Sequence, residues 1–149
     1  MKVINVYDIK ISDDFAKTKP KIKKIKNAMY YIDKHKTIDK PIVLNNGVLV
    51  DRYSRYLASI NKKIYEVPFV ELQDMIYIVG KFNNCQKEYV WKNDKNIDVE
   101  IGDKILVKSS NRNNDENIRV CVTVVDKFQS DSLELYNKHK SVIKKISNN

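Results

Sequence analysis

The sequence contains few of the residues that build metal sites or disulfides. Its 149 residues include two cysteines, Cys85 and Cys121, and two histidines, His35 and His139, whose spacing matches no zinc motif. We therefore expect no metal site and interpret both cysteines as reduced, structural thiols. No run of apolar residues approaches the ~20 that a membrane-spanning helix needs, and residues 1–5 lack the apolar core of a signal peptide. These absences predict a cytoplasmic protein that does not enter a membrane.

Arginine is scarce although the chain is basic. The net charge is +9, but 24 of the 28 basic residues are lysine and only four are arginine. A basic chain favours a polyanionic partner such as nucleic acid or a nucleotide. Base reading and bidentate phosphate recognition favour arginine, however, and lysine, asparagine and isoleucine make 58 of the 149 residues, a bias typical of AT-rich coding sequence. The charge alone therefore makes nucleic-acid binding a hypothesis.

The positive charge is concentrated in the first half of the chain. Residues 1–72 carry 15 basic and 8 acidic side chains, a net +7, and residues 17–40 account for this excess with nine lysines against Asp33 and Asp39. The length suits one or two small domains and excludes a large multidomain enzyme. A hydrophobic fraction of 42% beside 32% charged residues indicates a chain that folds.

The first half alternates between strand and helix patterns. Residues 3–11 predict one or two short strands. Apolar residues at helical spacing predict an amphipathic helix over residues 20–36, with Pro20 in its first turn and lysines on its outer faces. Residues 42–50 predict a hairpin with Asn46-Gly47 in its turn, because both residues tolerate a positive φ.

A second helix is predicted to begin at Asp51 as its N-cap, followed by a strand in which Pro68 lies at the start or at a sheet edge. The pattern then changes to four strands, and residues 130–146 predict a C-terminal helix. The strands are expected over residues 75–81, 88–92, 104–109 and 118–126. We therefore expect an α+β protein made of a small α/β domain, residues 1–72, and a small β-barrel-like domain with a C-terminal helix, residues 73–149.

The run VLVDRYSRYLAS, residues 48–59, predicts a strand, a sharp turn and a helix start that carries two arginines. A helix N-terminus offers unpaired N–H groups and the positive end of its dipole, and arginine adds a planar fork suited to phosphate oxygens. We therefore predict a phosphate- or nucleotide-binding site at Asp51, Arg52, Ser54 and Arg55. The alternative is an ordinary strand–helix junction whose arginines are solvated.

Residues 1–72 also resemble a known superfamily. The segments PIVL, GVLVD, RYLA and VPFV, at 41–44, 47–51, 55–58 and 67–70, follow the order found in the ParB/sulfiredoxin-like superfamily. The resemblance implies that superfamily's fold and a motif helix that binds nucleotide phosphates. These are CTP in ParB proteins and ATP in sulfiredoxin, with Mg²⁺ as the accompanying ion, and some members are nucleases. Arg55 matches the arginine common to these motifs, so the resemblance implies that it contacts a phosphate.

Three positions depart from the family pattern. Arg52 stands where the family usually has glycine, which lets the backbone approach a phosphate closely. Tyr53 replaces the acidic residue of partition proteins and the reactive cysteine of sulfiredoxins, and Ser54 replaces a basic residue or histidine. We therefore expect binding without clear catalytic machinery, and a nucleotide triphosphatase or nuclease if the protein is active. No helix-turn-helix segment follows, which argues against ParB-type recognition of palindromic DNA.

A second candidate site is the lysine-rich helix. Its exposed lysines form either a nucleic-acid surface or a solubilising face. The residues assigned to the nucleic-acid surface are Lys19, Lys21, Lys23, Lys24 and Lys26.

The second half resembles a family of small uncharacterised β-rich proteins from low-GC bacteria and their phages, through the segments GK, KEYVW and GDKILV at 80–81, 87–91 and 102–107. Together the two resemblances predict a ParB-like nucleotide- or nucleic-acid-binding protein of phage or mobile-element origin. The alternative is a protein-interaction module, such as an inhibitor or adaptor of a host nucleic-acid machine, and Arg52 in place of glycine favours it.

Overall fold

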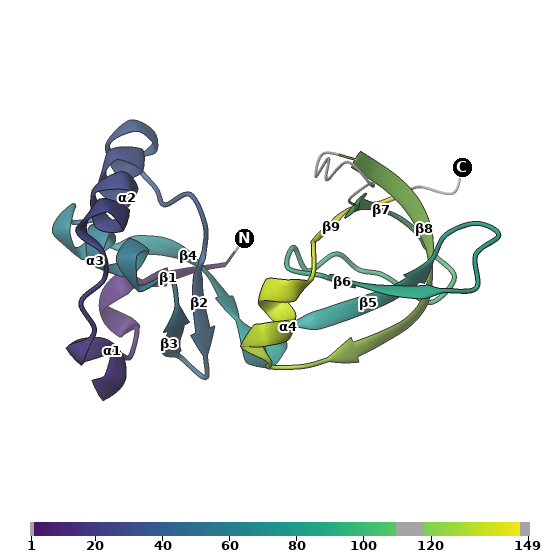
Figure 1. Ribbon diagram of the computed structural model, residues 1–149, viewed down its shortest axis with the longest axis horizontal. Helices are drawn as coiled ribbons and strands as arrows, with labels where there is room; N and C mark the ends of the chain where they lie inside the picture. Colours follow the sequence, from purple (N-terminus) through teal and green to yellow (C-terminus); the bar gives the residue numbers. More distant parts are fainter. Residues whose placement is uncertain (1, 110–117, 147–149) are drawn as a thin grey trace. The chain divides into compact units, whose positions relative to one another are not determined.

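The computed structural model describes residues 2–109 and 118–146. The chain forms two compact units, Met1–Leu72 and Gln73–Asn149. Each unit has its own sheet, so the protein is a mixed α+β protein, as the sequence predicts (Figure 1). Among the described residues, no helix is both long enough and apolar enough to cross a membrane.

The first unit contains a four-stranded sheet in the order β1-β4-β2-β3. The predicted hairpin is confirmed, because β2 and β3 are antiparallel and joined by a turn in which Asn46 and Gly47 have positive φ. β2 also pairs with β4 in parallel. The strands are β1 (Val3–Asn5), β2 (Ile42–Asn45), β3 (Val48–Asp51) and β4 (Glu66–Glu71).

The expectation that Pro68 lies at a sheet edge or a strand start is wrong. It is the third residue of β4, which pairs with β1 on one side and β2 on the other. Pro68 lies opposite Val3, the first residue of β1. Because Phe69 N–H donates to the Lys2 carbonyl on the β1 side, the Pro68 nitrogen faces β2, whose pairing with β4 begins only at Phe69 opposite Ile42, so no ladder hydrogen bond is lost.

Three α-helices belong to the first unit: α1 (Asp13–Lys17), α2 (Ile22–His35) and α3 (Tyr53–Asn61). The amphipathic helix is confirmed, but it begins after Pro20, with Lys21 as its N-cap. Helix α1 is additional to the prediction. It forms because the Ser12 side chain accepts a hydrogen bond from the Phe15 N–H and two aspartates occupy its first turn.

Helices α2 and α3 lie side by side (Figure 1). Their inner faces pack on the sheet in one apolar core, where Ile32 of α2 and Ala58 of α3 join the strand residues Ile42, Leu44 and Leu49. This packing brings the two helices together at the candidate site.

The second unit is an antiparallel sheet in the order β6-β5-β8-β7-β9. The four predicted strands are confirmed as β5 (Ile76–Lys81), β6 (Glu88–Lys92), β7 (Lys104–Ser109) and β8 (Ile118–Gln129). The edge strands are not paired along their length: one isolated bridge links Lys92 of β6 to Ser141, just before β9. The described strands therefore form a curved sheet without the continuous closure of a barrel.

The predicted C-terminal helix over residues 130–146 is wrong. Helix α4 (Leu133–Lys138) is short, and the chain then extends into β9 (Val142–Lys145), which pairs with β7. Val142 is fully buried in the sheet core opposite Val107. The apolar residues fit a helical spacing, but a ladder with a distant strand determines the structure.

Gly80 provides a test of packing in the second unit. A Cβ at this position would lie 2.9 Å from Val122 Cγ2 and 3.1 Å from Trp91 Cζ3, both on buried side chains. Overpacking destabilises the folded state by about 1–3 kcal/mol. Replacing glycine with alanine also reduces the conformational entropy of the unfolded chain, which stabilises the fold by only about 0.4–1 kcal/mol. Gly80→Ala should therefore lower the free energy of unfolding in urea by roughly 1 kcal/mol or more. The exposed Gln86→Ala is the control, and equal stability of the two variants would contradict the packing.

Candidate functional site

The junction between β3 and α3 is a single residue in the left-handed conformation. Arg52 has φ 70° and ψ 42° and is the N-cap of α3. The prediction of Asp51 as N-cap is therefore wrong, because its Oδ1 accepts from the very next N–H, that of Arg52, at 2.7 Å. A positive φ favours glycine, which has no Cβ to clash with the backbone. Arginine thus occupies a position whose left-handed backbone conformation favours glycine.

The Arg52 side chain is tied to the start of β2. Its Nη1 donates a hydrogen bond of 2.6 Å to the carbonyl oxygen of Pro41. The neighbouring Tyr53 packs on Phe15, with ring centroids 5.3 Å apart. Asp51, Arg52 and Tyr53 therefore shape the turn and its surroundings, and none of them lines the pocket described below.

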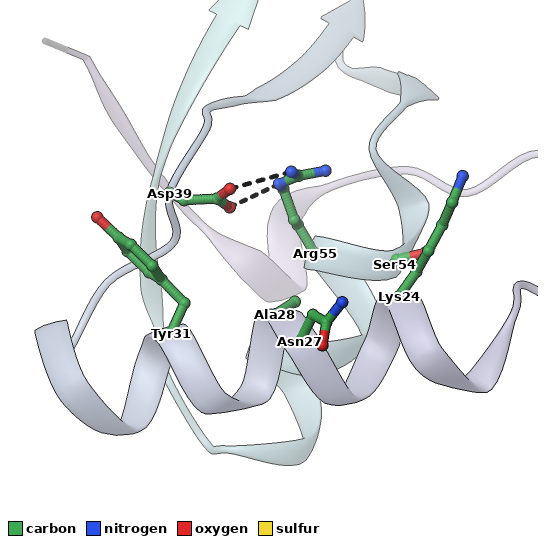
Figure 2. Close-up of a pocket in the computed structure, with 7 residues that line it drawn as sticks. All are labelled: Lys24, Asn27, Ala28, Tyr31, Asp39, Ser54 and Arg55. Atoms are coloured by element: carbon green, nitrogen blue, oxygen red, sulfur yellow. Dashed lines mark hydrogen bonds and ion pairs between the residues drawn. The ribbon is translucent and has the colours of Figure 1, made fainter.

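Arg55 forms a two-bond fork with Asp39, a residue of the segment between α2 and β2. Arg55 Nε donates to Asp39 Oδ1 at 2.7 Å, and Nη2 donates to Oδ2 at 3.1 Å (Figure 2). These hydrogen bonds from Arg55 are the main cause that holds the pKa of Asp39 below its ordinary value. A guanidinium has five N–H donors, so the fork uses two, and the donors of Nη1 stay available to a ligand.

A pocket of about 370 Å³ lies between α2 and α3, a volume within the range of small-ligand sites (Figure 2). Lys24 and Tyr31 stand at opposite ends of its α2 side, with Ala28 between them. Arg55 and Asp39 lie across from the helix. The lining residues are Lys24, Asn27, Ala28, Tyr31, Asp39, Ser54 and Arg55.

Both helices that line the pocket begin without the usual stabilisation. Neither α2 nor α3 has a side-chain cap or an acidic residue in its first turn, and their N-caps are Lys21 and Arg52. In contrast, α1 and α4 each have a serine cap and acidic first-turn residues. Cations near a helix N-terminus are unfavourable by about 0.3–1 kcal/mol each, because they repel the positive end of the dipole. The pocket therefore lies beside two helix starts of positive potential, which Asp39 and Asp51 partly offset at α3.

The predicted site residues divide into three groups. Lys24, Ser54 and Arg55 come together in the pocket, and Asp51 and Arg52 build the turn beside it. The remaining predicted lysines are exposed and lie outside the pocket: Lys19, Lys21, Lys23 and Lys26.

The sequence indicated Tyr31 as a residue that either stacks bases or packs in the core, and it lines the pocket, whereas Asn27 and Asp39 were missed. Asn27 shares a helical face with Lys24, as the three-residue spacing indicates. No local pattern marks Asp39 as the partner of Arg55.

The pocket does not offer a protein ligand set for Mg²⁺. Its one carboxylate, Asp39, has both oxygens engaged by Arg55. Across residues 2–109 and 118–146, no three His, Cys, Asp or Glu side chains cluster as they would to hold a metal. An Mg²⁺ brought by a nucleotide would therefore depend on the phosphates rather than on these residues.

Comparison with known proteins does not assign the chain to a family. No family model matches the chain, and no curated protein matches it. A solved structure described as "Structure of the C2221 form of Pnob8-like ParB-N domain" is similar at 21% identity and a TM-score of 0.41, over 47% of this chain and 28% of that one. The matched part thus spans less than a third of that protein. A similarity at this level does not assign the chain to the ParB family, so the ParB resemblance and the phage origin stay predictions.

Substitution of Arg52 tests the strained turn. Arg52→Ala and Arg52→Gly both remove the hydrogen bond to Pro41, but only alanine keeps a Cβ at φ 70°. The left-handed conformation costs a non-glycine residue about 1–2 kcal/mol, partly offset by the greater unfolded-state entropy of glycine, about 0.4–1 kcal/mol. We expect Arg52→Gly to be the more stable variant by roughly 0.5–1 kcal/mol in urea unfolding. A more stable Arg52→Ala would contradict the turn geometry.

The Asp39–Arg55 pair predicts a defined pH dependence. Because the folded-state pKa of Asp39 lies below the ordinary 3.8, its stabilising effect is fully present above that value and is lost as the pH falls through the folded pKa. Wild type should be more stable than Asp39→Asn at neutral pH, and the difference should shrink as the pH falls below 3.8. Urea unfolding followed by circular dichroism across this range measures it. A difference that does not change with pH would contradict the pair.

Proposed function

We propose that the unit Met1–Leu72 binds the phosphate groups of a nucleotide or of a nucleic-acid strand in the pocket between α2 and α3. One observation carries the proposal. The first turns of two basic, uncapped helices contribute Lys24, Ser54 and Arg55 to a single pocket. The backbone N–H groups of Lys24 and Arg55 already donate to the carbonyls of Lys21 and Arg52, so the two helix starts favour an anion through the positive ends of their dipoles.

Each pocket residue has a distinct part in phosphate binding. Arg55 presents the donors of Nη1 from a guanidinium that Asp39 holds in place, which reduces the entropy lost on binding. Lys24 is exposed and has no ion-pair partner in the described part of the chain, so its ammonium is available without breaking a contact. The Ser54 hydroxyl adds a neutral donor.

The charge balance of the pocket favours an anion. Lys24 and Arg55 carry +2 and Asp39 carries −1, so the lining has a net +1 before the helix dipoles are counted. A phosphate neutralises this charge. The surrounding unit carries a net +7, which attracts polyanions over distances comparable to the Debye length. This field favours nucleic acid and nucleotides over small neutral ligands.

Arg55→Ala tests the proposed site. Loss of a hydrogen bond to a charged group costs about 1.5–3 kcal/mol, so the dissociation constant should rise roughly 10- to 150-fold. Calorimetric titrations with CTP, ATP and a short oligonucleotide, each with and without Mg²⁺, measure this change. Arg119→Ala, which removes an exposed arginine of β8 in the other unit, is the matched control and should bind as wild type does.

Two results would contradict the proposal. One is an Arg55→Ala variant that binds as tightly as Arg119→Ala. The other is a wild-type chain that shows no saturable binding to any of the three ligands, which would favour the protein-interaction alternative.

A further inference from the structure

The pocket has an aromatic end that phosphate binding alone does not explain. Tyr31 is half-buried, and its ring packs on His35 with centroids 4.2 Å apart and planes at 31°. Seven residues separate it from Lys24, a rise of roughly 10 Å along the helix. Small Ala28 lies between them and leaves the space of the pocket open (Figure 2). A flat ring in the same pocket as two cations offers a stacking surface for a nucleobase beside a site for its phosphate.

The positive surface continues past the cationic end of the pocket. Lys21 precedes Lys24 by three residues, so the two side chains are neighbours on one helix face. Lys23 and Lys26 lie on other faces of the helix. In the described ranges neither Lys21 nor Lys24 has an ion-pair partner. A nucleoside monophosphate that fills the pocket leaves Lys21 unused, whereas a longer strand places a further phosphate on it.

We infer that the ligand of this pocket is a single strand of nucleic acid, with one base stacked on Tyr31, its phosphate at Lys24 and Arg55, and the adjacent phosphate at Lys21. This inference rests on the proposed phosphate site and names its ligand. A duplex fits less well, because its bases are paired and stacked and reach Tyr31 only after unstacking. A single strand presents its bases directly to aromatic side chains.

Two adjacent tyrosines make a matched test. Tyr31→Ala should weaken binding of a fluorescently labelled oligo(dT) roughly 5- to 150-fold in an anisotropy titration, and Tyr31→Phe should keep wild-type affinity because the ring is retained. Tyr30→Ala is the control. Tyr30 is 61% exposed, lies outside the pocket and has Lys34 Nζ 4.7 Å from its ring centroid. Melting curves of all three variants check that each is folded.

The salt dependence tests the strand beyond the pocket. Lys21→Gln should reduce the slope of log K against log salt for the oligonucleotide by about 0.7, because one phosphate contact is lost. It should leave the affinity for CMP unchanged, since a nucleoside monophosphate has no further phosphate to place at Lys21.

The inference is overturned if a duplex of equal length binds as tightly as the single strand, or if Tyr31→Ala binds as Tyr30→Ala does. It is also overturned if Tyr31→Phe loses binding, because stacking would then not be the cause. If Arg55→Ala weakens the oligonucleotide while Tyr31→Ala does not, the phosphate site stands and only the strand assignment fails. If neither variant weakens it, both fail.

Discussion

The hydrogen-bonded fork between Arg55 and Asp39 joins the first turn of α3 to the segment that follows α2. The same segment receives the second arginine of this turn, because Arg52 donates to the carbonyl of Pro41. A partly exposed ion pair contributes little to stability, about 0–1 kcal/mol, so its importance here is geometric. It fixes where the guanidinium points in the pocket between the two helices. The account of the site therefore depends on residues 39–41.

The charges at the starts of α2 and α3 are opposite in sign to those that stabilise a helix N-terminus. Helices α1 and α4 each begin with a serine cap and an acidic first turn. Helices α2 and α3 have no side-chain cap, and their N-cap residues are Lys21 and Arg52. Arg52 adds backbone strain at a positive φ. Local departures of this kind concentrate at functional sites, where a ligand supplies the missing interaction. A bound phosphate would neutralise both helix starts at once.

The sequence predicted local elements better than long-range ones. The β2–β3 hairpin follows from the turn residues Asn46 and Gly47. The sequence also indicated Arg55, which lines the pocket, because a strand followed by a helix start is a local pattern. The C-terminal helix was wrong because pairing with β7, which no local signal records, places Val142 in a strand. Asp39 was missed for the same reason. Asp39 and Tyr31 reach the pocket only through the packing of α2 against α3, and single-residue patterns do not contain that packing.

The most direct test is to map the bound ligand on the protein. Titration of the ¹⁵N-labelled chain with a single-stranded oligonucleotide, followed by amide chemical shifts, locates the contact residue by residue. The account predicts that the largest shifts occur in the first turns of α2 and α3, at Lys24, Ser54 and Arg55, and extend along α2 to Tyr31. Shifts that gather in Gln73–Asn149, or none at a saturating concentration, would contradict it.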